Sequence, residues 1–370
     1  MSIPYVKGIV AKQAHVAIPD GTIEEEIGRN GFFGRYAHIY RTHSPLNWTR
    51  IEGPRKPQAF DLRKMKFHAE TSTRHTFLSN EDVAISFARV EKPMDYFYRN
   101  ADGDEVLFVH QGGGRLESDY GPLNYNKGDY LVIPRGTVYR LAPTDASSFL
   151  VVESFSEVNF PDRGMLGQHA LFDPAMIRVP TPEFGNNSTI SERREYEVRV
   201  KHRGQFTKIF YPFCPLDAVG WKGTLSVMQL NVTDIRPVLS DRYHLPPSAH
   251  STFVANNFVI CTFLPRPLEN GDDKALKVPF YHSNIDFDEV IFYHEGEFFS
   301  RSGIDEGMIT YHPQGIHHGP HRKAIERSAD KKRTNEIAVM IDTKNPLNVH
   351  DAHEIEIRDY WKSWQEREGN

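Results

Sequence analysis

The stretch PFYHSNIDFDEVIFYHEGEFF at residues 279–299, followed by GMITYHPQGIHH at residues 307–318, carries the clearest pattern in this chain. Short runs of β-branched and aromatic residues alternate in it with glycine, proline, asparagine and aspartate, which is typical of strands joined by tight turns. Side chains alternate in and out along strands, so residues at these offsets can converge inside one barrel. The stretch therefore predicts a small β-barrel.

The same spacing occurs twice in the chain. In the second half, the positions that define it are His282, Asn284, Glu289, Gly296, Gly307, Pro313, Gly315 and His318. In the first half, the corresponding positions are Tyr98, Asn100, Glu105, Gly112, Gly128, Pro134, Gly136 and Tyr139. An internal repeat of this kind predicts two similar structural units. Tyrosines replace both histidines in the first unit, so the two units are not chemically equivalent.

The remainder of the chain indicates an all-β protein. Further β-rich runs lie at residues 106–109, 130–133, 149–152, 225–232, 258–263, 290–293 and 337–341. Long helical periodicity is nearly absent, and the exception is the C-terminal tail, where Ile357, Trp361 and Trp364 fall on one face of a short predicted helix. We expect this helix to pack against the protein rather than to carry chemistry.

A change in composition near the middle of the chain suggests where the two units meet. Residues 161–190 are rich in proline, glycine and asparagine and show weak periodicity, which is typical of a linker or an elaborated loop. We therefore expect an N-terminal domain at residues 1–160 and a C-terminal domain at residues 191–370.

Composition and charge exclude several classes of protein. The chain has 370 residues, a net charge of −5 and a pI near 6.4, so it has no basic field for holding nucleic acid. We find no apolar stretch long enough to span a membrane and no signal-peptide pattern, so we expect a cytoplasmic protein that does not bind membranes. Cys214 and Cys261 are too few for a disulfide framework or a cysteine zinc site. The 18 histidines outnumber the 16 tyrosines, and histidine is the commonest metal ligand.

The paired spacing resembles the two motifs of the cupin family, and two copies of it resemble a bicupin, a chain with two double-stranded β-helix barrels. This resemblance implies that His282, Glu289 and His318 bind a metal ion. Two imidazoles and one carboxylate on one side of an ion form the arrangement of non-haem Fe(II) oxygenases, so we expect Fe(II). Asn284 stands where many cupins carry another histidine, which leaves positions free for substrate and dioxygen. In the first half Glu105 cannot hold a metal alone, so we expect that barrel to be structural or to build an interface.

The second half also resembles the iron-binding stretch of the homogentisate 1,2-dioxygenase family. The resemblance rests on residues 279–289, on His312, and on the run His317-His318-Gly319-Pro320. Upstream, His244 with Pro247 and Ser248 resembles the segment that contains the family's proposed acid/base histidine. The resemblance covers most of the chain in order and layout, and it is most specific from residue 244 to residue 320.

Several residue roles follow from this resemblance. His244 is the expected base, with His250 in reserve. His312 and His317 are candidates for orienting the ligands or the bound oxygen through hydrogen bonds, although a plain structural role is equally open for His317. Asp288 competes with Glu289 for the carboxylate position, and the six residues between Glu289 and Gly296 favour Glu289.

The implied function is ring cleavage in the catabolism of tyrosine and phenylalanine. The enzyme would insert both atoms of O2 into homogentisate and give maleylacetoacetate, with a small aromatic acid and O2 as its partners and a homo-oligomer as its assembly. Alternatives are an Fe(II) cupin dioxygenase for gentisate or another hydroxylated aromatic acid or hydroquinone, a metal-dependent sugar phosphate isomerase, and a storage or regulatory bicupin. The ligand types alone do not separate iron from manganese.

Overall fold

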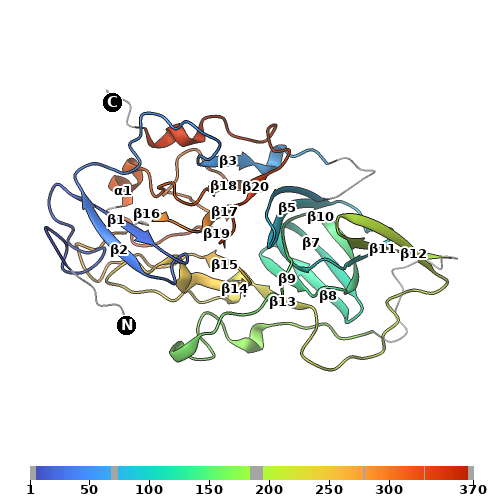
Figure 1. The fold of residues 1–370 in the computed structure, drawn as a ribbon. Coiled ribbons are helices and arrows are strands. Elements are labelled where there is room, and N and C mark those ends of the chain that lie inside the picture. Colours follow the sequence, from blue (N-terminus) through green and yellow to red (C-terminus); the bar gives the residue numbers. More distant parts are fainter. Residues whose placement is uncertain (1–5, 68–73, 184–194, 278–279, 329, 366–370) are drawn as a thin grey trace.

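Three β-sheets make up the protein in the computed structural model, which describes residues 6–67, 74–183, 195–277, 280–328 and 330–365. The two larger sheets, of eleven and six strands, form two barrels that lie side by side (Figure 1). Within these residues the only α-helix is α1 (Arg322–Ser328), and no helix is long and apolar enough to cross a lipid bilayer. Short 3-10 helices occur at Leu62–Lys64, Gly164–Leu166, Pro174–Met176, Val232–Asp234, Pro247–His250 and Tyr360–Trp364. The predicted all-β bicupin fold is confirmed.

The eleven-stranded sheet forms the N-terminal barrel. Its strands are β4 (Arg74–Ser79), β5 (Val83–Val90), β6 (Phe97–Asn100), β7 (Asp104–Ser118), β8 (Gly121–Asn126), β9 (Asp129–Ile133), β10 (Val138–Ser154), β11 (Tyr196–His202), β12 (Gln205–Tyr211), β13 (Met228–Asn231) and β20 (Asn348–Val349). Alternation along β7 divides its apolar side chains between two cores. Leu107 and Val109 pack inside the barrel, whereas Val106 and Phe108 face the other barrel.

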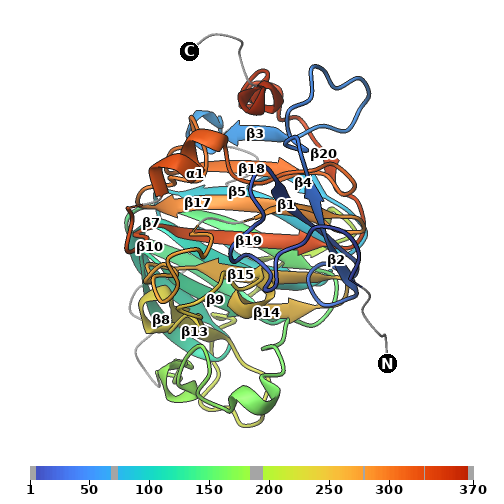
Figure 2. The ribbon, with the colours of Figure 1, turned by 90° about the vertical axis from the view of Figure 1, so that its left-hand side faces the viewer.

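The six-stranded sheet forms the C-terminal barrel. Its strands, in spatial order, are β14 (Ser251–Ala255), β15 (Phe258–Phe263), β19 (Ile337–Thr343), β17 (Asp288–Glu295), β18 (Met308–His312) and β3 (Gln58–Asp61), as Figure 2 shows. On β17, Val290 and Phe292 join the core shared with the other barrel, and Ile291 and Tyr293 pack inside. Glu289 lies two positions before Ile291, and side chains two positions apart on a strand face the same side. The carboxylate of Glu289 therefore also points into the barrel.

Strands from each half of the sequence pair with strands from the other half, across the predicted boundary. The third sheet places β1 (Ile23–Gly28) between β16 (Tyr281–Asn284) and β2 (Tyr36–Arg41), with β1 parallel to β16. β3 completes the six-stranded sheet, while β13 and β20 pair with β9 and β4 of the eleven-stranded sheet. Each half of the sequence thus contributes strands to the sheet of the other half. The boundaries at residues 160 and 190 stay a prediction.

The C-terminal tail forms a 3-10 helix rather than an α-helical turn. Asp359 adopts a left-handed backbone with φ of 57°, which interrupts the helical path before Tyr360. As a result the buried side chains are Tyr360 and Trp364, and Trp361 is only partly buried. The predicted packing role applies, since the Trp364 indole donates a 3.1 Å hydrogen bond to the carbonyl of Gly319.

Two buried histidines meet between the barrels. Nδ1 of His110 on β7 lies 2.9 Å from Nδ1 of His294 on β17, and the two residues are 184 positions apart, the same offset that relates Glu105 to Glu289. Because one nitrogen must donate and the other accept, at least one ring is neutral. Burial and the charge of Lys127 lower the pKa of His110 to about 4, and burial and the neighbouring His110 lower that of His294 to about 3. Glu295, which pairs with Lys127 at 3.0 Å, opposes the shift of His110 only in part.

We predict that this pair makes the protein sensitive to acid. Below the ordinary histidine pKa near 6.5 the unfolded chain binds protons that the folded pair does not, so the free energy of unfolding falls as the pH drops from 6.5 towards 4. Each histidine contributes about 1.4 kcal/mol per pH unit in that window. In urea unfolding at pH 7.0, 6.0 and 5.0, the double variant His110→Gln/His294→Gln should show a clearly smaller pH slope than the parent. An unchanged slope would contradict a neutral pair.

Candidate metal centre

Three side chains from separate segments converge inside the C-terminal barrel. His282 lies on β16, Glu289 on β17, and His318 after β18, where it pairs with His282 through two backbone hydrogen bonds of 3.0 Å. Nε2 of His282 and Nε2 of His318 lie 3.4 and 3.3 Å from Oε2 of Glu289. All three residues are buried, and one ligand atom of each lies within 4.8 Å of the others. The structure therefore brings together the three residues predicted as ligands.

Backbone carbonyls set the tautomers of both histidines. Nδ1 of His282 lies 2.9 Å from the carbonyl of Phe280, and Nδ1 of His318 lies 3.1 Å from that of Ile316. A carbonyl only accepts, so each Nδ1 carries the proton and each Nε2 presents its lone pair. Both Nε2 atoms are buried without a hydrogen-bond partner. Two orphaned buried lone pairs facing a carboxylate fit a bound divalent metal ion.

The carboxylate of Glu289 stays ionised in this buried position. Burial alone would raise its pKa, but the neighbouring His318 and the hydrogen bond from His312 hold it well below its usual range. Asp342 on the neighbouring strand shows the opposite behaviour, because burial and repulsion from Glu289 and Asp288 raise its pKa well above the ordinary value. One anionic and one neutral carboxyl group thus lie side by side.

His312 holds the Glu289 carboxylate at the oxygen that does not face the two ligand histidines. Its Nδ1 lies 2.8 Å from Oε1 of Glu289, and its ring stacks on that of His318 with centroids 4.8 Å apart and planes 8° apart. The ring is fully buried, and burial together with the charge of His318 lowers the pKa of His312 to about 3 although Glu289 opposes the shift. A neutral His312 can therefore donate to Oε1 while Oε2 faces the two ligand histidines.

Asp288, the alternative carboxylate, is used elsewhere. Its Oδ2 accepts hydrogen bonds from the Tyr311 hydroxyl at 2.9 Å and from the Leu347 amide at 2.7 Å, and its Oδ1 accepts one from the Gln314 amide at 2.8 Å. These bonds tie β18 and two loops to β17 on the side away from Glu289. The geometry favours Glu289 as the ligand.

Asn284 is a second polar group left without partners. It is 1% exposed, follows His282 by two positions on β16, and has neither its amide nitrogen nor its amide oxygen hydrogen-bonded within the described structure. Residues two apart share one face of a strand, so His282 and Asn284 face the same side. Asn284 could therefore bind a group held at the centre.

A cavity opens in front of the ligands and contains the predicted base. His244, His250, Phe280, His282 and Glu289 line it together with other residues of the barrel mouth. Burial lowers the pKa of His244 and burial also lowers that of His250, to about 3, so both are neutral. The buried Nδ1 of His250 has no hydrogen-bond partner in the described structure.

Glu269 holds His244 in place and was not predicted from the sequence. Its Oε1 lies 3.2 Å from Nδ1 of His244 and 2.9 Å from Nη1 of Arg266. Burial opposes ionisation of Glu269, but His244 and Arg266 lower its pKa to about 2. Nη2 of Arg266 also lies 3.3 Å from Nδ1 of His244, so this nitrogen faces both the Glu269 carboxylate and the Arg266 guanidinium. Glu269 lies 25 positions beyond His244 in an irregular segment, so no spacing signal connects them.

His317 lies outside this cavity. Its Nε2 contacts Glu25 of β1, which also binds Arg41, and its side chain is 34% exposed. The contact links the segment before His318 to the sheet of β1. This arrangement favours the structural of the two roles considered for His317.

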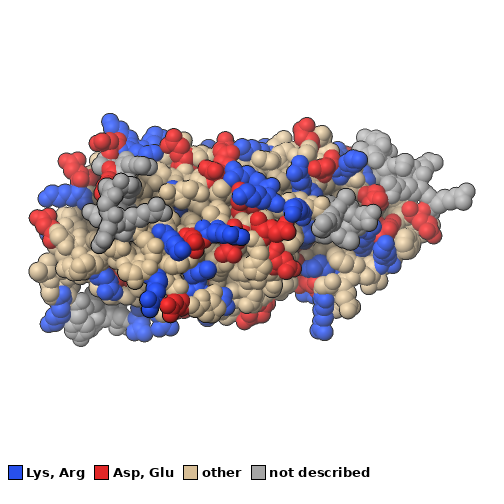
Figure 3. Space-filling view, turned by 90° about the horizontal axis from the view of Figure 1, so that it is seen from above, with Lys and Arg blue, Asp and Glu red and all other residues tan. Residues whose placement is uncertain are grey.

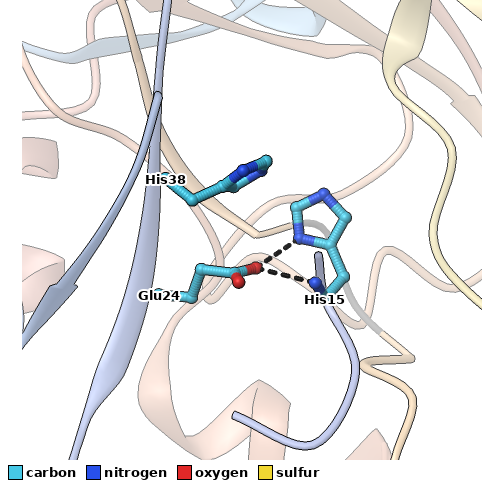
Figure 4. Close-up of side chains that lie close together, drawn as sticks. All are labelled: His15, Glu24 and His38. Carbon is cyan, nitrogen blue, oxygen red and sulfur yellow. Dashed lines mark hydrogen bonds and ion pairs between the residues drawn. The ribbon is translucent and has the colours of Figure 1, made fainter. Parts of the chain in front are cut away.

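Figure 4 shows a second group that could hold a metal ion, formed by His15, Glu24 and His38. The ring of His15 stacks on that of Phe280. Oε1 of Glu24 accepts bonds from the backbone amide and Nδ1 of His15 at 2.9 and 2.6 Å, and Oε2 accepts one from the Tyr40 hydroxyl at 2.6 Å. His38 is bonded to Glu26 at 3.0 Å. None of these side-chain atoms is buried without a partner, in contrast to the Nε2 atoms of His282 and His318. We interpret this group as a saturated hydrogen-bond network.

In the N-terminal barrel a guanidinium group lies at the position that corresponds to the metal. Arg74 pairs with Glu105, the counterpart of Glu289, and its Nη2 lies 3.5 Å from the Tyr139 hydroxyl. That hydroxyl donates a 2.8 Å hydrogen bond to Oε2 of Glu105, and the guanidinium carbon lies 5.6 Å from the centre of the Tyr98 ring. A permanently charged arginine compensates Glu105 without a metal ion.

The fold and the site together define a class: a bicupin with a candidate histidine–glutamate metal centre in its C-terminal barrel. The family model described as "Homogentisate 1,2-dioxygenase N-terminal" matches residues 27–231. A protein of Saccharolobus solfataricus named "Putative dioxygenase SSO1533" is 33% identical over 97% of this chain and 98% of its own length. Homogentisate 1,2-dioxygenase of Rhizobium leguminosarum is 25% identical over 86% of this chain and 73% of its own length.

Among solved structures, a cupin 2 conserved barrel domain protein from Leptotrichia buccalis covers 77% of this chain and 96% of its own, with 11% identity and a TM-score of 0.37. The sequence matches are the informative ones. The chain belongs to the homogentisate 1,2-dioxygenase family. Membership of this dioxygenase family and the buried histidine–glutamate group both indicate a metal cofactor.

We predict that replacing His312 by phenylalanine weakens metal binding while preserving the ring stack. Loss of the bond to Oε1 frees the Glu289 carboxylate to rotate, and losing such an outer hydrogen bond typically costs about 10- to 100-fold in metal affinity. Competition with a chelator measures the affinity of the folded protein. The matched control His317→Asn should change the affinity by less than about threefold, and equal affinities for His312→Phe and the parent would refute the positioning role.

Proposed function

We propose that the protein is a ring-cleaving dioxygenase that uses Fe(II) at His282, Glu289 and His318 and acts on homogentisate to give maleylacetoacetate, a step in tyrosine and phenylalanine catabolism. The observation that carries this proposal is the convergence, in a member of this family, of two orphaned imidazole lone pairs and one carboxylate. Two of these groups, His282 and Glu289, line a cavity that also contains a neutral histidine. Bound there, Fe(II) would supply open positions for a phenolic oxygen and dioxygen.

His244 is suited to remove the phenol proton. It is neutral because burial lowers its pKa, and Glu269 and Arg266 both contact its Nδ1 and hold the ring in place. Its ring lies 6.1 Å from that of Phe280, which in turn lies 5.5 Å from the ring of His282. The base, Phe280 and the metal ligand thus line one cavity, and Phe280 offers an aromatic ring as a contact for a planar substrate.

The charges of the cavity fit an acidic substrate. Arg301 and Arg266 line it, and Nε of Arg301 is buried without a hydrogen-bond partner while its Nη1 donates a 2.8 Å bond to the carbonyl of Gly319. Arg266 is already paired with Glu269. Glu336 also lines the cavity, and burial raises its pKa to about 7 although the nearby arginines oppose the shift. Its carboxyl group is therefore only partly ionised at neutral pH and does not fully neutralise the charge of Arg301. A carboxylate substituent would compensate this guanidinium.

Oxygen uptake tests the proposal. Protein loaded with Fe(II) without air and then mixed with homogentisate in aerated buffer should consume one O2 per substrate as product absorbance appears. The His318→Ala variant, which lacks one ligand, is the matched control and should be inactive. Uptake with gentisate or another hydroquinone but not homogentisate would replace the substrate and keep the centre, and no uptake with any of them would refute a dioxygenase.

We also predict that His244→Asn retains its metal and loses turnover. General-base catalysis contributes about 100- to 10,000-fold, so kcat should fall within that range. Glu269→Gln should show a smaller loss, because the imidazole remains but the carboxylate that contacts both His244 and Arg266 is gone. Metal content and kcat measured on the same samples separate this effect from a loss of the metal centre, and near-normal turnover would indicate His250 or no protein base.

A further inference from the structure

The N-terminal barrel encloses a large cavity that no step of the proposed reaction uses. Its volume is about 870 Å³, within the range of about 300–1,000 Å³ that is usual for small-molecule sites. It opens beside the hairpin of β11 and β12, at the end of the molecule far from the C-terminal barrel (Figure 1). The proposed metal centre lies in the other barrel, so this cavity is a separate space.

The walls of the cavity are apolar and its floor is polar. The apolar side chains are those of Ala88, Val90, Leu107, Leu141, Phe149 and Val151. The floor is the group of Arg74, Tyr98 and Tyr139 around Glu105. Arg74 and Tyr139 already bind both oxygens of the Glu105 carboxylate, so this carboxylate does not need a metal ion to compensate it. An apolar chamber of this kind suits a ring or a short hydrocarbon body.

The mouth of the cavity is cationic. Seven charged residues line the space, of which five are basic, namely Arg74, Arg199, Lys201, Arg203 and Lys208, and two are acidic, namely Asp102 and Glu153. The two acids are both within reach of Lys201, at 3.2 Å for Asp102 and closer for Glu153. Glu105 compensates Arg74, and Glu197 compensates one of Arg199 and Lys208, so one positive charge remains in excess around the apolar chamber. Such a charge attracts an organic anion.

Two of the basic groups are held in place and one is available. Arg199 pairs with Glu197 at 2.6 Å and lies 3.6 Å from the centre of the Tyr96 ring, which fixes its guanidinium at the rim. Lys208 shares the same Glu197 at 3.3 Å. Arg203, at the turn between β11 and β12, makes no side-chain ion pair within the described structure.

The basic residues at the cavity mouth do not belong to a basic field over the whole protein, whose net charge is −5. Figure 3 shows acidic and basic side chains interspersed over the face seen from above, with no single sign dominating it. The bias towards basic residues at the cavity mouth is therefore local. A local bias around an enclosed space is the expected arrangement for a binding site rather than for general solubility.

We propose that the N-terminal barrel is a second ligand site, which binds a small aromatic carboxylate with its ring between the apolar walls and its carboxylate at the basic mouth. The site goes beyond the proposed ring cleavage and needs no metal. Loss of metal ligands at Tyr98 and Tyr139 leaves the barrel as a chamber for binding rather than for chemistry.

The probe for this site is 4-fluorophenylacetate, observed by fluorine NMR with the full-length, metal-free protein. Binding should broaden and shift its signal in a saturable way, and the neutral 4-fluorophenylacetamide should bind at least about tenfold more weakly because it lacks the carboxylate. Equal binding of the acid and the amide would overturn the charge argument, and no binding of the acid would overturn the site.

A pair of matched variants locates the bound probe. Ala88→Phe fills the N-terminal chamber, whereas Ala338→Phe makes the same change at the wall of the metal cavity. We expect at least a tenfold loss of affinity for the first variant and no more than a twofold change for the second. The reverse result would place the probe in the metal cavity and overturn the proposal.

A rim variant keeps the test valid even if Ala88→Phe does not fold. Arg203 has φ of 50°, a conformation that asparagine tolerates better than most residues, so Arg203→Asn removes the charge without straining the turn. We expect affinity for the probe to fall about three- to tenfold while oxygen uptake at the other barrel is unchanged. Unchanged affinity in Arg203→Asn would overturn the role of the basic mouth.

Discussion

A buried carboxylate at the centre of each barrel is the constraint on which the rest of the structure depends. Glu105 and Glu289 occupy corresponding positions on β7 and β17, and both are almost completely buried. An ionised carboxylate is costly away from water unless a cation and hydrogen bonds compensate it. The two barrels surround this carboxylate with different side chains.

In the N-terminal barrel the compensation comes from the chain itself. Arg74 and the Tyr139 hydroxyl occupy the carboxylate oxygens of Glu105, so that centre is complete. In the C-terminal barrel the chain supplies only imidazoles. His312 occupies one oxygen of Glu289, and the other faces two Nε2 atoms that have no partner. A metal ion is the group that would complete this second arrangement.

The sheets explain how such a centre is kept in place. β1, from the start of the chain, pairs with β16, which carries His282, and β3 pairs with β18, which carries His312. The tail adds Trp364, whose ring lies 6.0 Å from that of His312. Ligands on paired strands, with buried side chains behind them, hold a geometry more closely than ligands on loops. Strand exchange between the halves thus contributes directly to the site.

The sequence was sufficient for the elements that follow a period or a spacing. The repeat predicted both barrels, and its resemblance to the cupin motifs implied the set His282, Glu289 and His318, because these residues occupy fixed offsets in the motifs. The sequence did not reveal the roles of Glu269 and Arg74 or the contact between His110 and His294. These residues meet their partners only in the folded protein, because the partners come from distant or irregular segments. The offset of 184 residues shared by both histidines and both central glutamates was a usable signal for the last of these. The pairing of β1 with β16 has no local signature, because any edge strand of suitable pattern could fill that place.

The most direct test of the account is the iron content of the chain after anaerobic loading with Fe(II) and removal of unbound metal, measured by elemental analysis against protein concentration. The account predicts one iron per chain, held by the C-terminal barrel, and close to none in Glu289→Gln. Two irons per chain would contradict the role of Arg74 as the compensating cation, and an iron-free chain would contradict the metal centre itself.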